Sequence, residues 1–311
     1  MPWYVPLLAT IANSCAVYPW FLKRWVSNER GLKRRLLLQY IFCLALALAV
    51  FAAVHPGTAP GAPLALLVLG AANGFSVYCQ WRAVQAHLSK FSLLTFWDDI
   101  LAIALGYVVL GEAQFINRWL GAGLVCMSVA TAGLVGSERM RTAKNGNKVG
   151  FRFYRFVLYY TTVSGLASFF KRSLALAGIS QAEWLLGWYG GSIVTVLALS
   201  AWLSDDPEST AASDGKRVFL RRDVVLAAAS SSFVFANAWT SFWTAQVAPI
   251  TVFQPVLFVA AMVIPVLIGL FAFKEAKGLG WLEGALMALA ALGGFLAAYG
   301  YHLGWEVQPN R

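Results

Sequence analysis

Two adjacent carboxylates stand out inside an apolar stretch of this chain. Asp98 and Asp99 lie seven and eight residues after Phe91, where the stretch begins. At about 1.5 Å of rise per helical residue, they would lie roughly 10 to 12 Å below the start of a membrane helix. A carboxylate at that depth costs at least ~2.5 kcal/mol on insertion scales and usually faces a cavity or a partner. The pair therefore predicts a polar site that binds a cation or a proton within a membrane.

Successive residues point about 100° apart on a helix, so one carboxylate would face the site while the other pairs elsewhere or carries a proton. A purely structural role remains the alternative. In that case the aspartates would form a hydrogen bond or an ion pair, with Lys171, Arg172 or Arg82 as the partner.

Other polar and aromatic side chains lie within or at the ends of apolar stretches and are candidates for a substrate pathway: Trp97, Asn73, Gln80, Asn237, Trp239, Gln254, Lys171 and Glu183. The two asparagine amides would either bind a substrate or bond across helices, as is common in membrane bundles. Lys171 and Arg172 would snorkel to the surface along their long stems, or else contact substrate. Glu183 stands near the start of its stretch, close to an interface.

Aromatic rings near the carboxylates suggest a particular kind of ligand. Trp97, Trp188 and Trp239 fall deep within apolar stretches rather than at their ends. A carboxylate beside such rings favours an organic cation, through charge pairing and a cation–π attraction of ~2 kcal/mol when desolvated. Packing in the protein core is the alternative role for each ring.

The composition places these residues in a bilayer. Hydrophobic residues make up 59% of the 311-residue chain and charged residues 12%, about half the share of an ordinary soluble domain. Apolar stretches of about 20 residues can cross ~30 Å of hydrocarbon as helices. Ten such spans are predicted: Trp3–Phe21, Leu36–Val54, Pro63–Trp81, Phe91–Leu110, Phe115–Val135, Phe156–Ala177, Gln181–Leu203, Val224–Gln246, Ile250–Phe273 and Leu279–Tyr301.

The basic residues are concentrated at alternate connections between these spans. Of the 24 Lys and Arg, 20 lie at the odd-numbered connections, and the remaining four are Arg118, Lys171, Arg172 and Arg311. The positive-inside rule then places the odd connections in the cytoplasm and both termini outside. Because the basic residues flank membrane spans, we expect the net charge of +10 to meet anionic lipid head groups and not nucleic acid.

The second half of the chain repeats the first. Asn73-Gly74-Phe75-Ser76 corresponds to Asn237-Ala238-Trp239-Thr240 at a shift of 164 residues, and Gly111-Glu112 to Lys274-Glu275 at a shift of 163. With five spans in each copy, the second copy must begin on the opposite side of the membrane. The chain would therefore consist of two inverted five-helix repeats, residues 1–137 and 154–311, joined by a cytoplasmic connector at 138–153. Such symmetry is typical of carriers that open a central site to each side in turn.

Several motifs in both halves resemble a known transporter repeat. In the first half the motifs are Trp81-Arg82-Ala83-Val84-Gln85-Ala86, Leu110-Gly111-Glu112 and Trp119-Leu120-Gly121-Ala122-Gly123. In the second half they are Thr244–Ala248, Gln254-Pro255-Val256, Phe273-Lys274-Glu275 and Gly284-Ala285. They are similar to the EamA repeat of the drug/metabolite transporter superfamily. The resemblance implies a ten-helix transporter whose central cavity is lined by the first, third, fourth, sixth, eighth and ninth spans. Bacterial members are similar in keeping both termini in the cytoplasm, whereas the charge count places these termini outside.

We therefore expect an all-α multi-pass protein of the plasma (inner) membrane that carries a small metabolite or organic solute by alternating access. Protons are the candidate coupling ion, and the chain would act as a monomer or homodimer without a cofactor. A flippase for lipid-linked or amphipathic substrates is the alternative. A metal-dependent membrane transferase at Asp98 and Asp99 is less favoured, because no other span offers a second acidic cluster. The two aspartates correspond to Ala261 and Met262 in the second half, so ion binding would belong to the first half alone.

Overall fold

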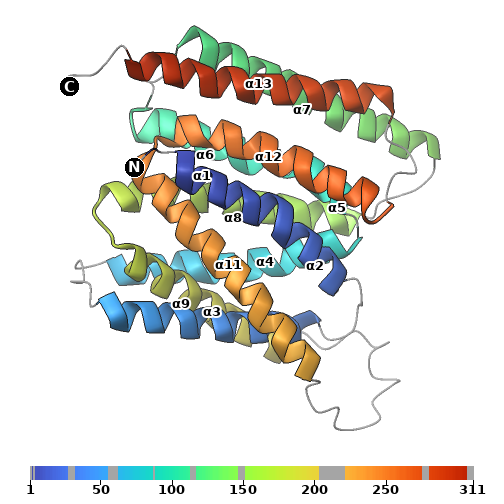
Figure 1. Ribbon diagram of the computed structural model, residues 1–311. Coiled ribbons are helices and arrows are strands. Elements are labelled where there is room, and N and C mark those ends of the chain that lie inside the picture. Colours follow the sequence, from blue (N-terminus) through green and yellow to red (C-terminus); the bar gives the residue numbers. More distant parts are fainter. Residues whose placement is uncertain are drawn as a thin grey trace.

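Every regular element in the described residues is a helix. The computed structural model describes residues 2, 4–26, 32–54, 62–86, 88–112, 117–145, 151–202, 221–274 and 280–306. The helices are α1 (Tyr4–Ile11), η1 (Ala12–Val17), α2 (Tyr18–Val26), α3 (Leu32–Val54), α4 (Ala62–Ala86), α5 (Leu88–Leu94), α6 (Phe96–Val109), α7 (Arg118–Asn145), α8 (Phe151–Leu176), α9 (Gln181–Trp202), α11 (Arg221–Val247), α12 (Ile250–Phe271) and α13 (Trp281–Glu306). The long helices run side by side, and the first helix begins on the side of the bundle where the last helix ends (Figure 1).

The bundle has the character of a multi-pass membrane protein. In the described residues, seven helices are long and apolar enough to cross a membrane: Tyr4–Val26, Leu32–Val54, Leu64–Ala86, Arg118–Ser137, Gln181–Ala201, Val224–Val247 and Ile250–Phe271. Large apolar side chains also face outward, among them Val108 at 83% exposure and Phe271 at 79%. Such outward faces suit a lipid environment, in which apolar surface costs nothing.

Two of the predicted spans are not uniform α-helices. The first contains a π-helical segment, η1, between α1 and α2. The fourth, which we expected to run unbroken from Phe91 to Leu110, is divided at Thr95 into α5 and α6. The Thr95 hydroxyl donates to the Ser92 carbonyl at 3.0 Å, and such local side-chain bonds compete with the helical pattern. Both irregularities lie in spans that border the interior cavity described below.

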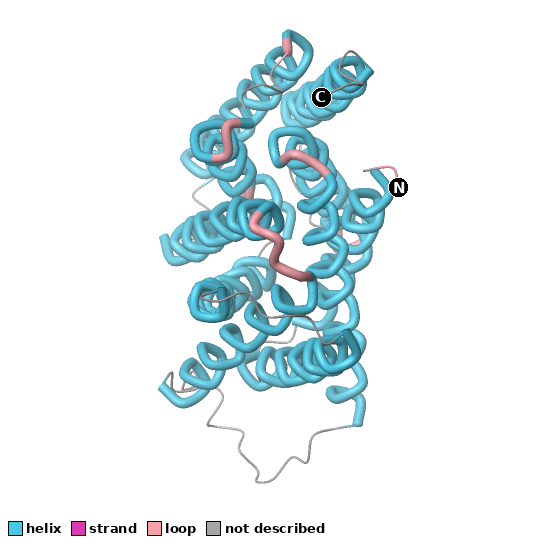
Figure 2. Tube along the Cα trace, turned by 90° about the vertical axis from the view of Figure 1, so that its left-hand side faces the viewer, coloured by secondary structure: helices cyan, strands magenta, loops and turns pink. Residues whose placement is uncertain are grey.

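Glycines allow two helix pairs to pack closely. A Cβ on Gly191 of α9 would meet the Leu67 carbonyl oxygen of α4, and one on Gly123 of α7 would meet the Gly293 carbonyl oxygen of α13. Small residues at membrane-helix crossings permit this backbone approach. The α7–α13 pair lies along one edge of the bundle, and the α3, α4 and α9 group lies toward the other (Figures 1 and 2).

The main hydrophobic core includes side chains from α3, α4 and α9 and also from α2, α8 and α11. Trp25 packs edge-on against Trp81 with ring centroids 5.2 Å apart, and Trp184 stacks on Phe242 at 5.3 Å. All four side chains belong to one buried cluster. This core forms a wall beside the polar groups in the interior of the bundle.

Candidate functional site

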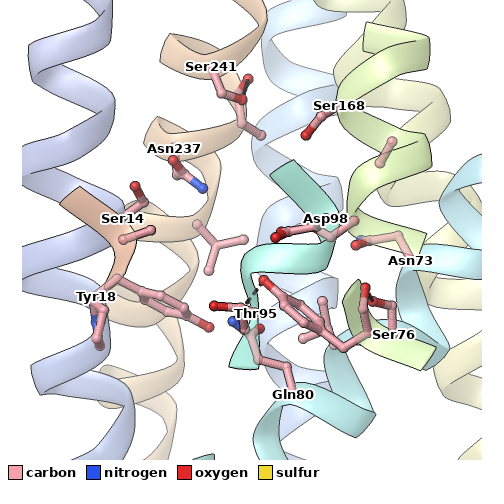
Figure 3. Close-up of a pocket in the computed structure, with 18 of the residues that line it drawn as sticks. Ser14, Tyr18, Asn73, Ser76, Gln80, Thr95, Asp98, Ser168, Asn237 and Ser241 are labelled. Atoms are coloured by element: carbon pink, nitrogen blue, oxygen red, sulfur yellow. Dashed lines mark hydrogen bonds between the residues drawn. The ribbon is translucent and has the colours of Figure 1, made fainter. Parts of the chain in front are cut away.

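A cavity of about 260 Å³ lies inside the bundle. Its lining comes from the predicted first, third, fourth, sixth, eighth and ninth spans, as expected, and also from α3 and α9. In the described residues, neither α7 nor α13 contributes to it. Figure 3 shows the polar lining residues Ser14, Tyr18, Asn73, Ser76, Gln80, Thr95, Asp98, Ser168, Asn237 and Ser241 gathered around one space.

Asp98 lies at the centre of the lining, in the first turn of α6. The break at Thr95 places this turn inside the bundle, where Asp98 faces Asn237 of α11 across the cavity (Figure 3). The Ser164 hydroxyl is within hydrogen-bonding reach of the carboxylate, and Lys171 is within electrostatic range. Asp98 therefore joins groups from α6, α8 and α11.

Asp99 is held by a residue from the other half of the chain. The Gln254 amide Nε2 donates to Asp99 Oδ1 at 2.5 Å, and both side chains are buried, at 2% and 7% exposure respectively. The oxygen of this amide, Oε1, has no hydrogen-bond partner among the described residues. Of the partners predicted for the aspartates, Lys171 alone is brought near Asp98, whereas Gln254 was not foreseen as the partner of Asp99.

Asn73 and Asn237, which correspond in the predicted repeat, both line the cavity, on opposite sides of it (Figure 3). Asn73 donates to the Tyr40 hydroxyl at 3.1 Å and to the Ser192 hydroxyl at 3.0 Å, so it bonds across helices. Asn237 Oδ1 is buried and has no partner in the described part of the chain. Of the pair, Asn237 therefore has unused hydrogen-bonding capacity. Gln80 also lines the cavity and lies 3.4 Å from the Tyr160 hydroxyl.

The expectation that Lys171 and Arg172 snorkel to the surface is wrong. Lys171 lines the cavity and donates to the Ser241 hydroxyl at 3.2 Å. Arg172 forms a salt bridge with Glu112 at 3.1 Å, and the two side chains are 11% and 5% exposed. Both bases remain inside because the interior provides oxygen acceptors. A side cavity of about 20 Å³, enough for one water molecule, is bordered by Lys171, Ser241 and Gln254.

Glu112 and Arg172 join four helix ends. Glu112 follows α6, and its second oxygen accepts from the Thr251 amide at 3.1 Å, at the start of α12. Arg172, near the end of α8, also donates to the Ala245 carbonyl at 2.7 Å, near the end of α11. We call this cluster the Glu112–Arg172 tie. Sequence reasoning used Glu112 only as part of a motif and missed this role.

Two of the predicted pathway residues have other positions, and the side chain of a third is not described. Glu183 is not among the cavity-lining residues. It accepts from the Ser180 amide at 2.8 Å, while Ser180 Oγ accepts from the Glu183 amide at 3.2 Å, so the two form a capping box on α9. Trp239 is not among the lining residues either, and its ring lies 6.2 Å from that of Phe235 beside the main core. The Trp97 side chain lies outside the part of the chain that the structure describes.

Several lining groups were not predicted. Ser14 and Cys15 belong to η1, and Tyr18 follows it in α2. The polar run Asn13-Ser14 within an apolar span was the available sequence signal. Trp188 of α9, expected to be deep, does line the cavity. In the described residues, no group of three His, Cys, Asp or Glu side chains could hold a metal ion.

Comparisons with known proteins support the fold and do not identify a family. No family model matches the chain, and no curated protein matches it. A solved structure described only as "Crystal structure of protein" is similar, with a TM-score of 0.63 at 13% identity over 96% of this chain and 98% of that one. At that identity, the likeness speaks for the fold alone.

Proposed function

We propose that this chain is a secondary transporter that moves a small solute across a membrane by alternating access. The observation that carries the proposal is the interior cavity, where Asp98, Asn237 and Lys171 meet within a bundle of membrane-type helices. Charged groups are rare at such depth unless they serve a pathway or a partner. A solute-sized polar space between the two halves of the chain is the arrangement that a carrier needs.

Two backbone conformations support an inverted repeat. Gly111 has a φ of 67° and Lys274 a φ of 54°, and Lys274 stands alone among the non-glycine residues described in adopting a positive φ. The two residues are 163 positions apart, follow the predicted fourth and ninth spans and precede a glutamate. A left-handed residue at the end of a helix reverses the chain direction, and lysine adopts it only at some cost. Duplication explains why the same turn occurs twice.

The helix contacts of one half recur in the other. In the predicted repeat, α1, α3, α4, α6 and α7 correspond to α8, α9, α11, α12 and α13. Under this correspondence the contacting pairs α4–α8, α6–α8 and α4–α9 become α11–α1, α12–α1 and α11–α3, which are also in contact. The pair α7–α13 maps onto itself. A twofold axis in the membrane plane would produce this pattern.

Basic side chains at the ends of the predicted first and sixth spans have the same environment. Lys23 donates to the Val84 carbonyl at 2.9 Å, near the end of α4. Arg172 donates to the Ala245 carbonyl at 2.7 Å, near the end of α11. Each base meets the negative end of a helix dipole in its own half of the chain.

The Glu112–Arg172 tie fits the closed end of a carrier. It joins α6, α8, α11 and α12 at the end of the bundle toward which α1 begins and α13 ends (Figure 1). In alternating access, these helix ends would separate in the opposite conformation.

We further propose membership of the drug/metabolite transporter superfamily, residence in the plasma membrane with both termini outside, and proton coupling through the aspartates.

Flux through liposomes that contain the purified chain would test the proposal. We expect saturable uptake of at least one small-solute class, and faster uptake when the same solute is loaded on the opposite side, because a carrier returns faster when occupied. The Asp98→Asn variant should lose uptake, whereas Glu183→Gln, which lies outside the cavity, should retain it. A trapped pH dye would report proton movement, and a lipid probe would report flipping.

The proposal would be overturned if folded, oriented protein gave no solute-dependent flux. Lipid movement without soluble-solute movement would replace it with the flippase.

A further inference from the structure

With both carboxylates ionised, the side chains that line the cavity carry one negative charge in excess. Asp98 and Asp99 are its two carboxylates, and Lys171 is the one cationic side chain among the described lining residues. Excess charge in a low-dielectric interior is costly. A monovalent cation would neutralise this set of side chains, an anion would double the excess, and a zwitterion would leave it unchanged.

The cavity also has unused acceptors. Gln254 gives its amide N–H to Asp99, and its Oε1 is buried without a donor among the described residues. Asn237 lies opposite Asp98 (Figure 3), and its Oδ1 is also buried without a donor among the described residues. A buried acceptor without a donor loses its hydrogen bonds to water and gains none in return. A ligand with N–H groups would supply both the charge and the donors.

Aromatic side chains form other parts of the wall. Trp188 lines the cavity and stacks on Trp184, with ring centroids 4.9 Å apart. Phe91 and Tyr160 also line it, with centroids 5.2 Å apart. Aromatic faces attract cations and bury apolar groups. The ligand is therefore expected to combine a charged end with an apolar body.

The size of the cavity limits that body. Its volume of about 260 Å³ lies below the ~300–1,000 Å³ of sites for drug-sized ligands. It corresponds to roughly nine water molecules at ~30 Å³ each. A single metal ion would leave most of the space unfilled, and a long lipid chain would not fit.

We infer that the cavity binds a small protonated amine with an apolar or aromatic body, its N–H groups directed to Asp98 and to the amides of Asn237 and Gln254. The meaning of this site for transport rests on the proposed function. Asp99 is hydrogen-bonded to Gln254, and Lys171 is hydrogen-bonded to Ser241.

Binding to the purified full chain in lipid nanodiscs, measured by calorimetry, would test the inference. The probes share a phenylethyl body and differ in the end group: 2-phenylethylamine, its trimethylammonium analogue, phenylalanine, 3-phenylpropionate and 2-phenylethanol. The amine should bind about 10- to 100-fold more tightly than the alcohol and the carboxylate, as expected for a hydrogen bond between charged groups. It should also bind more tightly than the trimethylammonium compound, which has no N–H.

Single-residue variants then test which side chains bind the amine. Asp98→Asn, nearly identical in shape, should weaken amine binding about 10- to 100-fold while leaving alcohol binding unchanged. Asn237→Leu should weaken the amine more than the trimethylammonium analogue. The matched carboxylate-to-amide control is Glu183→Gln, which should leave binding unchanged. If Asp98→Asn fails to fold, the probe series on the unchanged chain still decides the ligand class.

Tighter binding of phenylalanine or of phenylpropionate would overturn the inference, and so would equal binding of the amine and the alcohol. Flux measurements separate this failure from failure of the proposed function. Transport of another solute class without amine binding would sink the inference and leave the transporter standing. Amine binding without any flux would support the inferred ligand class and overturn the proposed transport function.

Discussion

Asp99 of α6 accepts a 2.5 Å hydrogen bond from Gln254 of α12, so a buried carboxylate in the first half of the chain is held by an amide in the second half. The two residues are 155 positions apart. Because the bond joins two helices that both line the cavity, its loss should affect stability as well as the site.

We predict that Gln254→Leu lowers the free energy of unfolding by about 1–3 kcal/mol, since it leaves the Asp99 oxygen buried without a donor. Denaturant titration in detergent micelles would measure the change. The matched control is Gln246→Leu, because the Gln246 side chain is exposed at the end of α11. Adding Asp99→Leu to Gln254→Leu should recover part of the loss, and equal effects of the two glutamine variants would contradict the prediction.

We predict that Glu112→Gln lowers the free energy of unfolding by about 3–5 kcal/mol, because Arg172 would keep its charge in a buried setting. The same titration would measure it. The double variant Glu112→Leu with Arg172→Leu should lose less than the single variant, since no uncompensated charge remains. Arg118→Gln serves as the control because Arg118 is exposed. A single-variant loss as small as that of the control would argue against the tie.

Two neighbouring glycines of α9 should respond in opposite directions to alanine. A Cβ on Gly191 would meet the backbone of α4, whereas one on Gly190 would meet only a flexible Leu67 methyl group at 3.4 Å. Gly191→Ala should therefore destabilise the protein by about 1–3 kcal/mol through overpacking. Gly190→Ala should be neutral or stabilise it by about 0.5–1 kcal/mol through helix propensity. Thermal unfolding of the two purified variants would compare them, and similar melting temperatures would refute the close α4–α9 crossing.

The proposed orientation can be tested with single cysteines at opposite ends of the bundle. Ala177, after α8, and Ala86, at the end of α4, are both exposed, whereas native Cys15, Cys43 and Cys79 are buried. With the termini outside, a membrane-impermeant maleimide should label Ala177→Cys in intact cells and Ala86→Cys only after permeabilisation. Replacing Cys126 by serine in both variants removes the partly exposed native thiol. The reverse labelling pattern would place the termini in the cytoplasm.

The sequence by itself determined that this is a helical multi-pass membrane protein, because apolar length and composition belong to each segment separately. It also identified Asp98 as a deep polar group, since depth follows from the distance to the start of the span. The capping role of Glu183 was readable from Ser180, three residues earlier, but was not recognised. These properties are local.

Only the tertiary structure decided which polar groups meet. Arg172 was expected at the surface but finds Glu112, 60 residues away, and Asp99 finds Gln254 rather than a base. Hydropathy and helical spacing describe one segment, whereas partners depend on how distant helices cross. The burial cost that favours snorkelling is offset when another helix supplies an acceptor.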